Sequence, residues 1–141
     1  MILLDTDHFT VFTDERDPRH EQLRTRLEAA DEPVVCTIVT VEEVLRGWLA
    51  FIHRHRDVRR QIPAYSRLGR LIDVLGDWEV VPFDERAADR FAGLRQERLR
   101  IGTMDIKIAA IALVHDALLV TANFRDFSAV RGLRCENWLS S

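Results

Sequence analysis

Three acidic residues that lie far apart in the chain have the chemistry and the placement of a metal site. Asp5 directly follows the apolar residues 2–4, Glu43 lies near the start of a segment with helical apolar spacing, and Asp105 precedes a nearly apolar stretch. Hard divalent cations such as magnesium bind oxygen ligands, and a few converging carboxylates are enough when a substrate phosphate supplies the rest. Such an ion lowers the pKa of a bound water and neutralises charge on a phosphate. These acids therefore predict phosphodiester hydrolysis that needs no Ser, Cys or His nucleophile.

Each acid also has a purely structural explanation, which the sequence alone leaves open. Asp5 is a good helix cap, and Thr40-x-x-Glu43 matches the capping box in which Thr pairs with Glu at the third helical position. Asp105 has apolar neighbours in the sequence, and a carboxylate in such a setting needs a polar or charged partner. The dipole at a helix start would satisfy that need in part, whereas a divalent cation would satisfy it fully. The combination of the three acids is more specific than any one of them.

Apolar periodicity and capping signals divide the chain into alternating strands and helices. Short apolar runs predict strands at residues 2–4, 33–36, 78–81 and 118–121. Helical spacing and caps predict helices from Asp17-Pro18 to about Ala30, from Thr40 through Ile52, from Pro63 to Leu75, from Asp84 through Leu94, and over residues 104–113.

This alternation favours the α/β class, as a single domain over residues 1–141 with a central parallel sheet flanked by helices. In such sheets the binding crevice lies outside the C-terminal ends of the strands. Asp5, Glu43 and Asp105 lie at predicted strand ends and helix starts. We therefore expect the three carboxylates to converge.

The composition is that of an ordinary globular protein. Hydrophobic residues make up 47% and charged residues 30% of the 141 residues, which sets aside the disordered and membrane classes. The start of the chain has neither a basic segment nor an apolar stretch of signal-peptide length, so we expect a cytoplasmic protein. Cys36 and Cys135 each lie in an apolar run, which favours buried thiols in a reducing compartment over a disulfide or a zinc site.

The net charge of −3 does not by itself indicate nucleic-acid binding. The most basic stretch either grips phosphates or forms a solvated helix surface, and it contains Arg54, Arg56, Arg59, Arg60, Arg67 and Arg70. Trp48, Phe51 and Ile52 lie on the helix predicted after Glu43 and could be core, dimer surface or a partner's groove, with core as the default.

The motifs that carry these acids resemble, in order and over nearly the whole chain, those of the PIN-domain ribonucleases, and among them the VapC-type toxins of prokaryotic toxin–antitoxin pairs. The first motif, at residues 3–7, resembles the family's opening acid motif, although Asn is commoner than Asp at position 7. The fourth motif, at residues 119–127, usually has Asp where this chain has Asn123, and Asp126 lies nearby. The four motifs are residues 3–7 (LLDTD), 43–47 (EVLRG), 103–112 (TMDIKIAAIA) and 119–127 (LVTANFRDF).

The resemblance implies a compact α/β fold and hydrolytic cleavage of structured RNA such as transfer or ribosomal RNA. It also implies magnesium or manganese at the acidic pocket. From the placement of the acids at strand ends and helix starts, we expect Asp5 and Asp105 to hold the metal directly, with Glu43 completing the pocket and Asn123 contributing weakly or through water. Family members studied as toxins are held inactive by a small antitoxin, so we expect an antitoxin partner and a homodimer.

Two other functions compete with this interpretation. Asp5-Thr6-Asp7 after an apolar strand also resembles the start of the haloacid-dehalogenase phosphatases, in which the first Asp is a nucleophile. Those enzymes use a Lys as well, and Lys107 is the sole lysine here. The second alternative is a degenerate PIN module that binds RNA or protein without cutting, an idea supported by Asn123 alone.

Overall fold

The computed structural model describes residues 1–139, which alternate between strands and helices from the first residues onward. In chain order the elements are β1 (Ile2–Leu4), α1 (Thr6–Phe12), α2 (His20–Ala29), β2 (Val34–Thr37), α3 (Ile38–Arg54), α4 (Val58–Gly76), β3 (Val80–Val81), α5 (Glu85–Gln96), α6 (Thr103–Val114), β4 (Leu118–Val120), α7 (Phe124–Phe127) and β5 (Arg134–Glu136).

The strands form one parallel sheet in the order β3-β2-β1-β4-β5. Leu3 lies at the centre of this sheet, paired with Val35 on one side and Leu119 on the other. From β1 the chain first adds strands on one side and later on the other, so the strand order reverses between β1 and β4. Ligands of open α/β sheets bind at such a reversal. The predicted α/β class with a central parallel sheet is confirmed.

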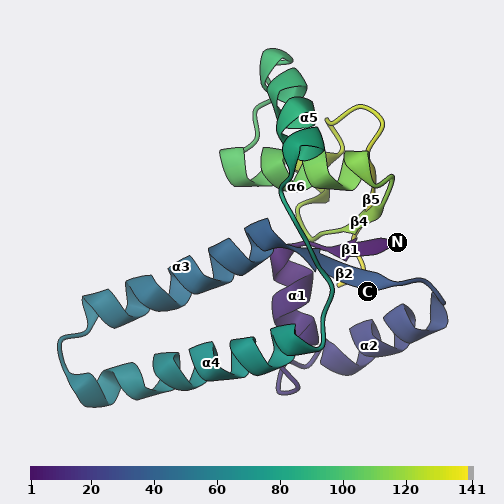
Figure 1. Ribbon diagram of the computed structural model, residues 1–141. Helices are drawn as coiled ribbons and strands as arrows, with labels where there is room; N and C mark the ends of the chain where they lie inside the picture. Colours follow the sequence, from purple (N-terminus) through teal and green to yellow (C-terminus); the bar gives the residue numbers. More distant parts are fainter. Residues whose placement is uncertain (140–141) are drawn as a thin grey trace.

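Alternate residues of the strands enter two cores, one on each face of the sheet. Leu3 and Leu119 pack against α5 and α6, where Ile108 and Ile111 are fully buried. Ile2, Leu4 and Val120 pack on the other face against α1, α2 and the end of α4. Figure 1 shows α5 and α6 on one side of the strands and α1 and α2 on the other. Both faces are covered, which explains why β1 consists of apolar residues alone.

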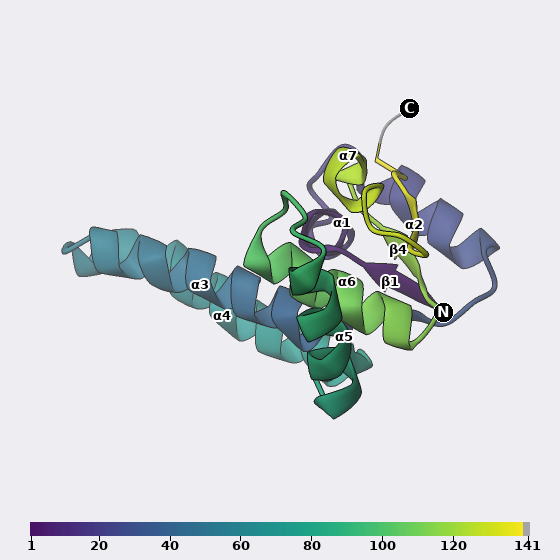
Figure 2. The ribbon, with the colours of Figure 1, turned by 90° about the horizontal axis from the view of Figure 1, so that it is seen from above.

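Helices α3 and α4 form a long antiparallel hairpin that projects from the body of the molecule (Figures 1 and 2). Its turn is stabilised by Gln61, whose side-chain amide donates to the carbonyls of Ile52 and His55 at 3.0 and 2.6 Å. Within residues 1–139 no helix is both long enough and apolar enough to span a bilayer.

Several predicted boundaries were wrong. Helix α2 begins at His20 rather than at Pro18 because the Asp17 carboxylate binds the Arg19 N–H and guanidinium and holds residues 17–19 in a turn. Helix α4 begins at Val58, where Asp57 accepts from the Arg59 N–H, so Pro63 lies inside the helix and removes one backbone hydrogen bond.

The sequence analysis also missed α1 altogether. Asp5 caps this helix through the Thr6 N–H, and its short segment contains β-branched and aromatic residues that have weak helix propensity. Burial of Phe9 and Val11 against the sheet overrides that propensity.

Candidate active site

Residues from four distant segments meet in a pocket of about 510 Å³ at the C-terminal ends of β1 and β4. All four sequence-predicted site residues, Asp5, Glu43, Asp105 and Asn123, line this acidic pocket. The remaining lining residues are Thr6, Asp7, Thr10, Val11, Asp17 and Arg19. The pocket lies next to the reversal of strand order, where a parallel sheet offers its binding crevice.

Asp5 is the most deeply buried of these acids, with 5% of its surface exposed. Its Oδ1 accepts from the Thr6 N–H at 2.8 Å and its Oδ2 accepts from the Thr121 hydroxyl at 2.6 Å. These bonds favour the charged form, but burial and then the neighbouring Asp7 carboxylate act against it. The net result raises the pKa of Asp5 from 3.8 to about 7. Near neutral pH, therefore, a substantial fraction of Asp5 carries a proton in the absence of a cation.

Glu43 lies in the second turn of α3 and does not form the predicted capping box. The N-cap of α3 is Thr37, whose hydroxyl accepts from the Thr40 N–H at 3.1 Å. Glu43 Oε1 instead accepts from the hydroxyl of Thr6 at 2.8 Å. The side chain is thus held against the start of α1, on the wall of the acidic pocket.

Asp105 lies in the first turn of α6, whose N-cap is Gly102. The amide nitrogen of Asn123 donates to Asp105 Oδ2 at 3.3 Å and to Asp126 Oδ2 at 3.1 Å, so Asn123 bridges the two carboxylates. Burial, followed by the charge of Glu43, raises the pKa of Asp105. Asn123 thus directs N–H groups, not its oxygen, at the carboxylates.

The donor set of the pocket fits a hard divalent cation, because its carboxylates supply oxygen atoms only. Within residues 1–139, no three Asp, Glu, His or Cys side chains are already gathered closely enough to hold a metal ion. Magnesium keeps several waters and is commonly held by one or two carboxylates together with substrate phosphate. After burial, the charges of Asp7 and Asp105 raise the pKa of Asp5, and the charge of Glu43 raises the pKa of Asp105. A bound cation would relieve this repulsion.

Two threonines that position the carboxylates were missed at the sequence level. Thr6 binds Glu43, and Thr121 binds Asp5 while its oxygen also accepts from the Asn123 N–H at 3.0 Å. Thr121 is completely buried. A polar residue at the end of the buried strand β4 was the available signal, because a buried hydroxyl needs a partner.

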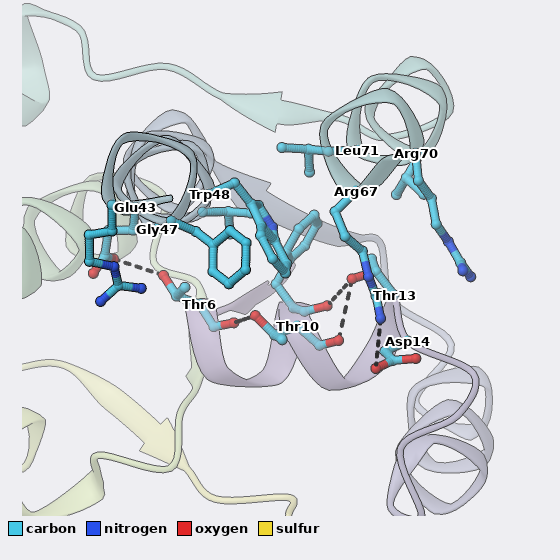
Figure 3. Close-up of a pocket in the computed structure, with 15 residues that line it drawn as sticks. Thr6, Thr10, Thr13, Asp14, Glu43, Gly47, Trp48, Arg67, Arg70 and Leu71 are labelled. Carbon is cyan, nitrogen blue, oxygen red and sulfur yellow. Dashed lines mark hydrogen bonds and ion pairs between the residues drawn. The ribbon is translucent and has the colours of Figure 1, made fainter. Parts of the chain in front are cut away.

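A second pocket, also about 510 Å³, lies between α1, α3 and α4 and shares Thr6, Thr10 and Glu43 with the acidic pocket. Figure 3 shows Trp48 and Arg67 facing α1 across this groove. Arg67 approaches Asp14 at 3.9 Å, and its guanidinium lies 6.0 Å from the centre of the Trp48 ring. We call this the hairpin groove, and its other lining residues are Phe9, Thr13, Val44, Gly47, Phe51, Arg54, Arg70, Leu71 and Val74.

Comparison with known proteins finds relatives over almost the full length of the chain. A family model described as PIN domain matches residues 2–133. The tRNA(fMet)-specific endonuclease VapC of Salmonella typhimurium (strain LT2) is 28% identical in an alignment that covers 96% of each chain. Among the solved structures that share the fold are two that cover almost the whole chain. FitAcB from Neisseria gonorrhoeae has a TM-score of 0.75 at 24% identity and full coverage of both chains. VapBC2 from Rickettsia felis, bound to a promoter DNA fragment, has a TM-score of 0.74 at 23% identity, covering 98% of this chain and 99% of its own.

Proposed function

The chain belongs to the PIN-domain family. From this premise we propose that it is a magnesium-dependent endoribonuclease, in which manganese can replace magnesium. We further propose that it is the toxin of a toxin–antitoxin pair. The observation that carries the proposal is the convergence of Asp5, Glu43 and Asp105 from three separate elements on one pocket. Burial and neighbouring carboxylates raise the pKa values of Asp5 and Asp105 there, and perturbed acids that line a pocket are typical of functional sites.

In this proposal Asp5 and Asp105 hold the ion, Glu43 completes the negative wall, and Asn123 acts weakly or through water. A bound magnesium ion would supply charge neutralisation at the phosphate and an acidified water. The chain's own contribution is orientation: the hydroxyls of Thr121 and Thr6 hold Asp5 and Glu43, and Asn123 holds Asp105. Preorganised carboxylates of this kind lower the reorganisation needed when substrate binds.

The decisive experiment is incubation of the protein with purified total RNA in magnesium, with and without a chelator. Discrete fragments that appear only with free magnesium are the expected result, and Asp5→Asn should produce none. A protein that binds RNA without cutting it in magnesium or manganese would be a degenerate module, and that outcome would overturn the enzyme assignment. Turnover of phosphomonoesters without RNA cleavage would point instead to phosphatase chemistry.

For the substrate, we propose a structured RNA such as a transfer or ribosomal RNA. We also propose that the protein acts in the cytoplasm. The relative from Salmonella typhimurium is named a tRNA(fMet)-specific endonuclease. Parallel digests of a transfer RNA pool and of intact ribosomes, followed by mapping of the new ends, identify the target. Equal cleavage of unstructured oligonucleotides would contradict a preference for structured RNA.

For the partner, we propose a short antitoxin with a segment that lies in the hairpin groove. The similar solved structures include a toxin–antitoxin complex from Klebsiella pneumoniae. The groove offers apolar contacts through Phe9, Trp48 and Phe51, and its arginines can pair with acidic side chains. It also opens onto Glu43, so that an occupant would restrict access to the acidic pocket. Co-expression with the adjacent open reading frame should relieve growth arrest and yield a complex.

We also propose that the chain forms a homodimer. Ile38, Leu45 and Leu49 on α3 are exposed large apolar residues that do not line the hairpin groove, as expected of a surface that a second copy covers. Light scattering should report twice the chain mass, and Leu49→Arg should shift it toward the monomer. A monomer in the wild-type protein at micromolar concentration would contradict this assignment.

A further inference from the structure

We propose that Asp7 is a positioning residue and not a metal ligand, held by the buried His8 ring and in turn holding the loop that carries Asn123. The proposal rests on the proposed function in one respect, because the property that Asp7 tunes is the affinity of the acidic pocket for a divalent cation. Asp7 lines that pocket and follows Asp5 by two residues, so a direct ligand role is the obvious alternative.

Hydrogen bonds already engage both oxygens of Asp7. Oδ1 accepts from the backbone N–H of His8 at 2.6 Å and from the His8 ring nitrogen Nδ1 at 2.6 Å. Oδ2 accepts from the backbone N–H of Ala122 at 3.0 Å. A carboxylate offers about four acceptor sites, and three of them are directed at protein N–H groups. The carboxylate therefore fastens α1 to the loop after β4.

The other side of the His8 ring determines which nitrogen carries the proton. His8 is fully buried, and its Nε2 lies 3.1 Å from the backbone nitrogen of Trp138, which can only donate. Nε2 must therefore present its lone pair, and the proton of the neutral ring lies on Nδ1, where it is donated to Asp7. The ring thus transmits the position of the C-terminal segment to Asp7.

The consequence reaches the metal site through two adjacent residues. Ala122, which Asp7 holds, precedes Asn123, and Asn123 binds Asp105. Thr121, on the other side of Ala122, binds Asp5. Asp7 accordingly fixes the loop that determines the relative positions of the proposed ligands Asp5 and Asp105. Partners that orient metal ligands in this way typically change metal affinity by about 10–100-fold when they are lost.

A matched pair of variants at His8 separates positioning from mere packing. In His8→Asn the amide nitrogen reaches the place of Nδ1 and can still donate to Asp7, whereas the Trp138 N–H loses its acceptor. In His8→Gln the longer side chain can accept from Trp138 but no longer donates to Asp7. We expect His8→Asn to have a lower melting temperature than wild type but to bind manganese within about threefold of the wild-type affinity. His8→Gln should bind manganese about tenfold more weakly than wild type. Asp7→Asn should resemble His8→Gln in manganese affinity.

Two readouts on the metal-free protein make the test independent of the proposed function. Long-range nitrogen NMR of wild-type His8 should place the ring proton on Nδ1, and a proton on Nε2 would overturn the proposal. Amide exchange at Ala122 should accelerate in Asp7→Asn relative to wild type. Unchanged exchange there would show that Asp7 does not hold the loop.

Manganese titration by calorimetry completes the test. Positioning through His8 would be refuted if His8→Asn and His8→Gln lost the same amount of manganese affinity. It would also be refuted if both variants kept wild-type affinity while Asp7→Asn lost most of it, because Asp7 would then have another role. A wild-type protein that binds no manganese would refute the proposed metal dependence, while the NMR and exchange results would still decide how Asp7 is held.

Discussion

The hydroxyl of Thr121 donates to Asp5 at 2.6 Å although 116 residues separate them in the chain. This bond joins the ends of the neighbouring strands β1 and β4 and supports the charged form of Asp5, whose pKa burial raises. Burial has the largest effect on how readily Asp5 becomes a carboxylate, and Thr121, a residue with no reactive role of its own, partly offsets it.

Replacing Thr121 with Val should raise the pKa of Asp5 further and destabilise the fold by about 1–3 kcal/mol, because a buried acceptor loses its donor. Carbon NMR of the Asp5 carboxyl group and urea unfolding measure the two effects. Thr121→Ser retains the hydroxyl and should keep the pKa of Asp5 near that of wild type. A Val variant with an unchanged Asp5 pKa would disprove the importance of this bond.

Asp5→Asn should change the pH dependence of stability in the metal-free protein. The folded protein holds the Asp5 proton up to about pH 7, whereas the unfolded chain releases it near pH 4. This group therefore stabilises the fold fully below about pH 4, and that stabilisation is lost as pH rises through 7, by up to about 4 kcal/mol. The variant should gain stability over wild type with rising pH, as measured by urea unfolding in chelator at pH 5 and pH 8. An equal change in unfolding free energy between pH 5 and pH 8 in both proteins would contradict the raised pKa of Asp5.

Cation affinity should increase with pH across the same range, because a bound cation must displace the Asp5 proton. With a pKa of about 7, the ionised fraction at pH 6 is about a tenth, so manganese should bind roughly tenfold more weakly there than at pH 8. Calorimetry in two buffers of different ionisation enthalpy would detect the released proton. Constant affinity without proton release would exclude Asp5 as a titrating ligand.

Asp105→Asn should nearly abolish RNA cleavage in magnesium while leaving thermal stability in chelator unchanged or higher. The neutral amide does not balance the charge of a cation, and its introduction relieves the repulsion from Glu43 that helps to raise the pKa of Asp105. The control is Asp89→Asn, at an exposed acid on α5, which should cut RNA as wild type does. A variant at position 105 that cuts at the wild-type rate would remove Asp105 from the catalytic set.

Trp48→Ala should weaken binding of the antitoxin by more than about tenfold, because a buried aromatic anchor typically dominates a binding groove. RNA cleavage by the variant alone should persist, since Trp48 lies outside the acidic pocket. Tyr65→Ala is the matched control: Tyr65 is an exposed aromatic residue on α4 that does not line the hairpin groove. Both affinities are measurable by titration of the purified antitoxin. Equal effects of the two substitutions would place the partner elsewhere.

The sequence predicted the positions of the acids better than their local surroundings. Asp5 and Asp105 were expected at a strand end and a helix start, and both lie there. The same local reasoning failed at Glu43, because Thr40-x-x-Glu43 satisfies the capping-box pattern while Thr37 actually caps the helix. A capping pattern describes one turn of one helix, and it contains no information about Thr6 on another element, to which Glu43 is bound.

The sequence by itself determined the α/β class, since apolar runs such as residues 2–4 cannot be solvated and must pair as buried strands between helices. Its motifs also determined the family, which the match over residues 2–133 confirms. Only the tertiary structure decided which distant groups hold the acids: Thr121 on Asp5, the Ala122 N–H on Asp7, and Asn123 on Asp105. Those contacts join residues up to 116 positions apart. They depend on the order of strands in the sheet, which local propensity and spacing do not encode.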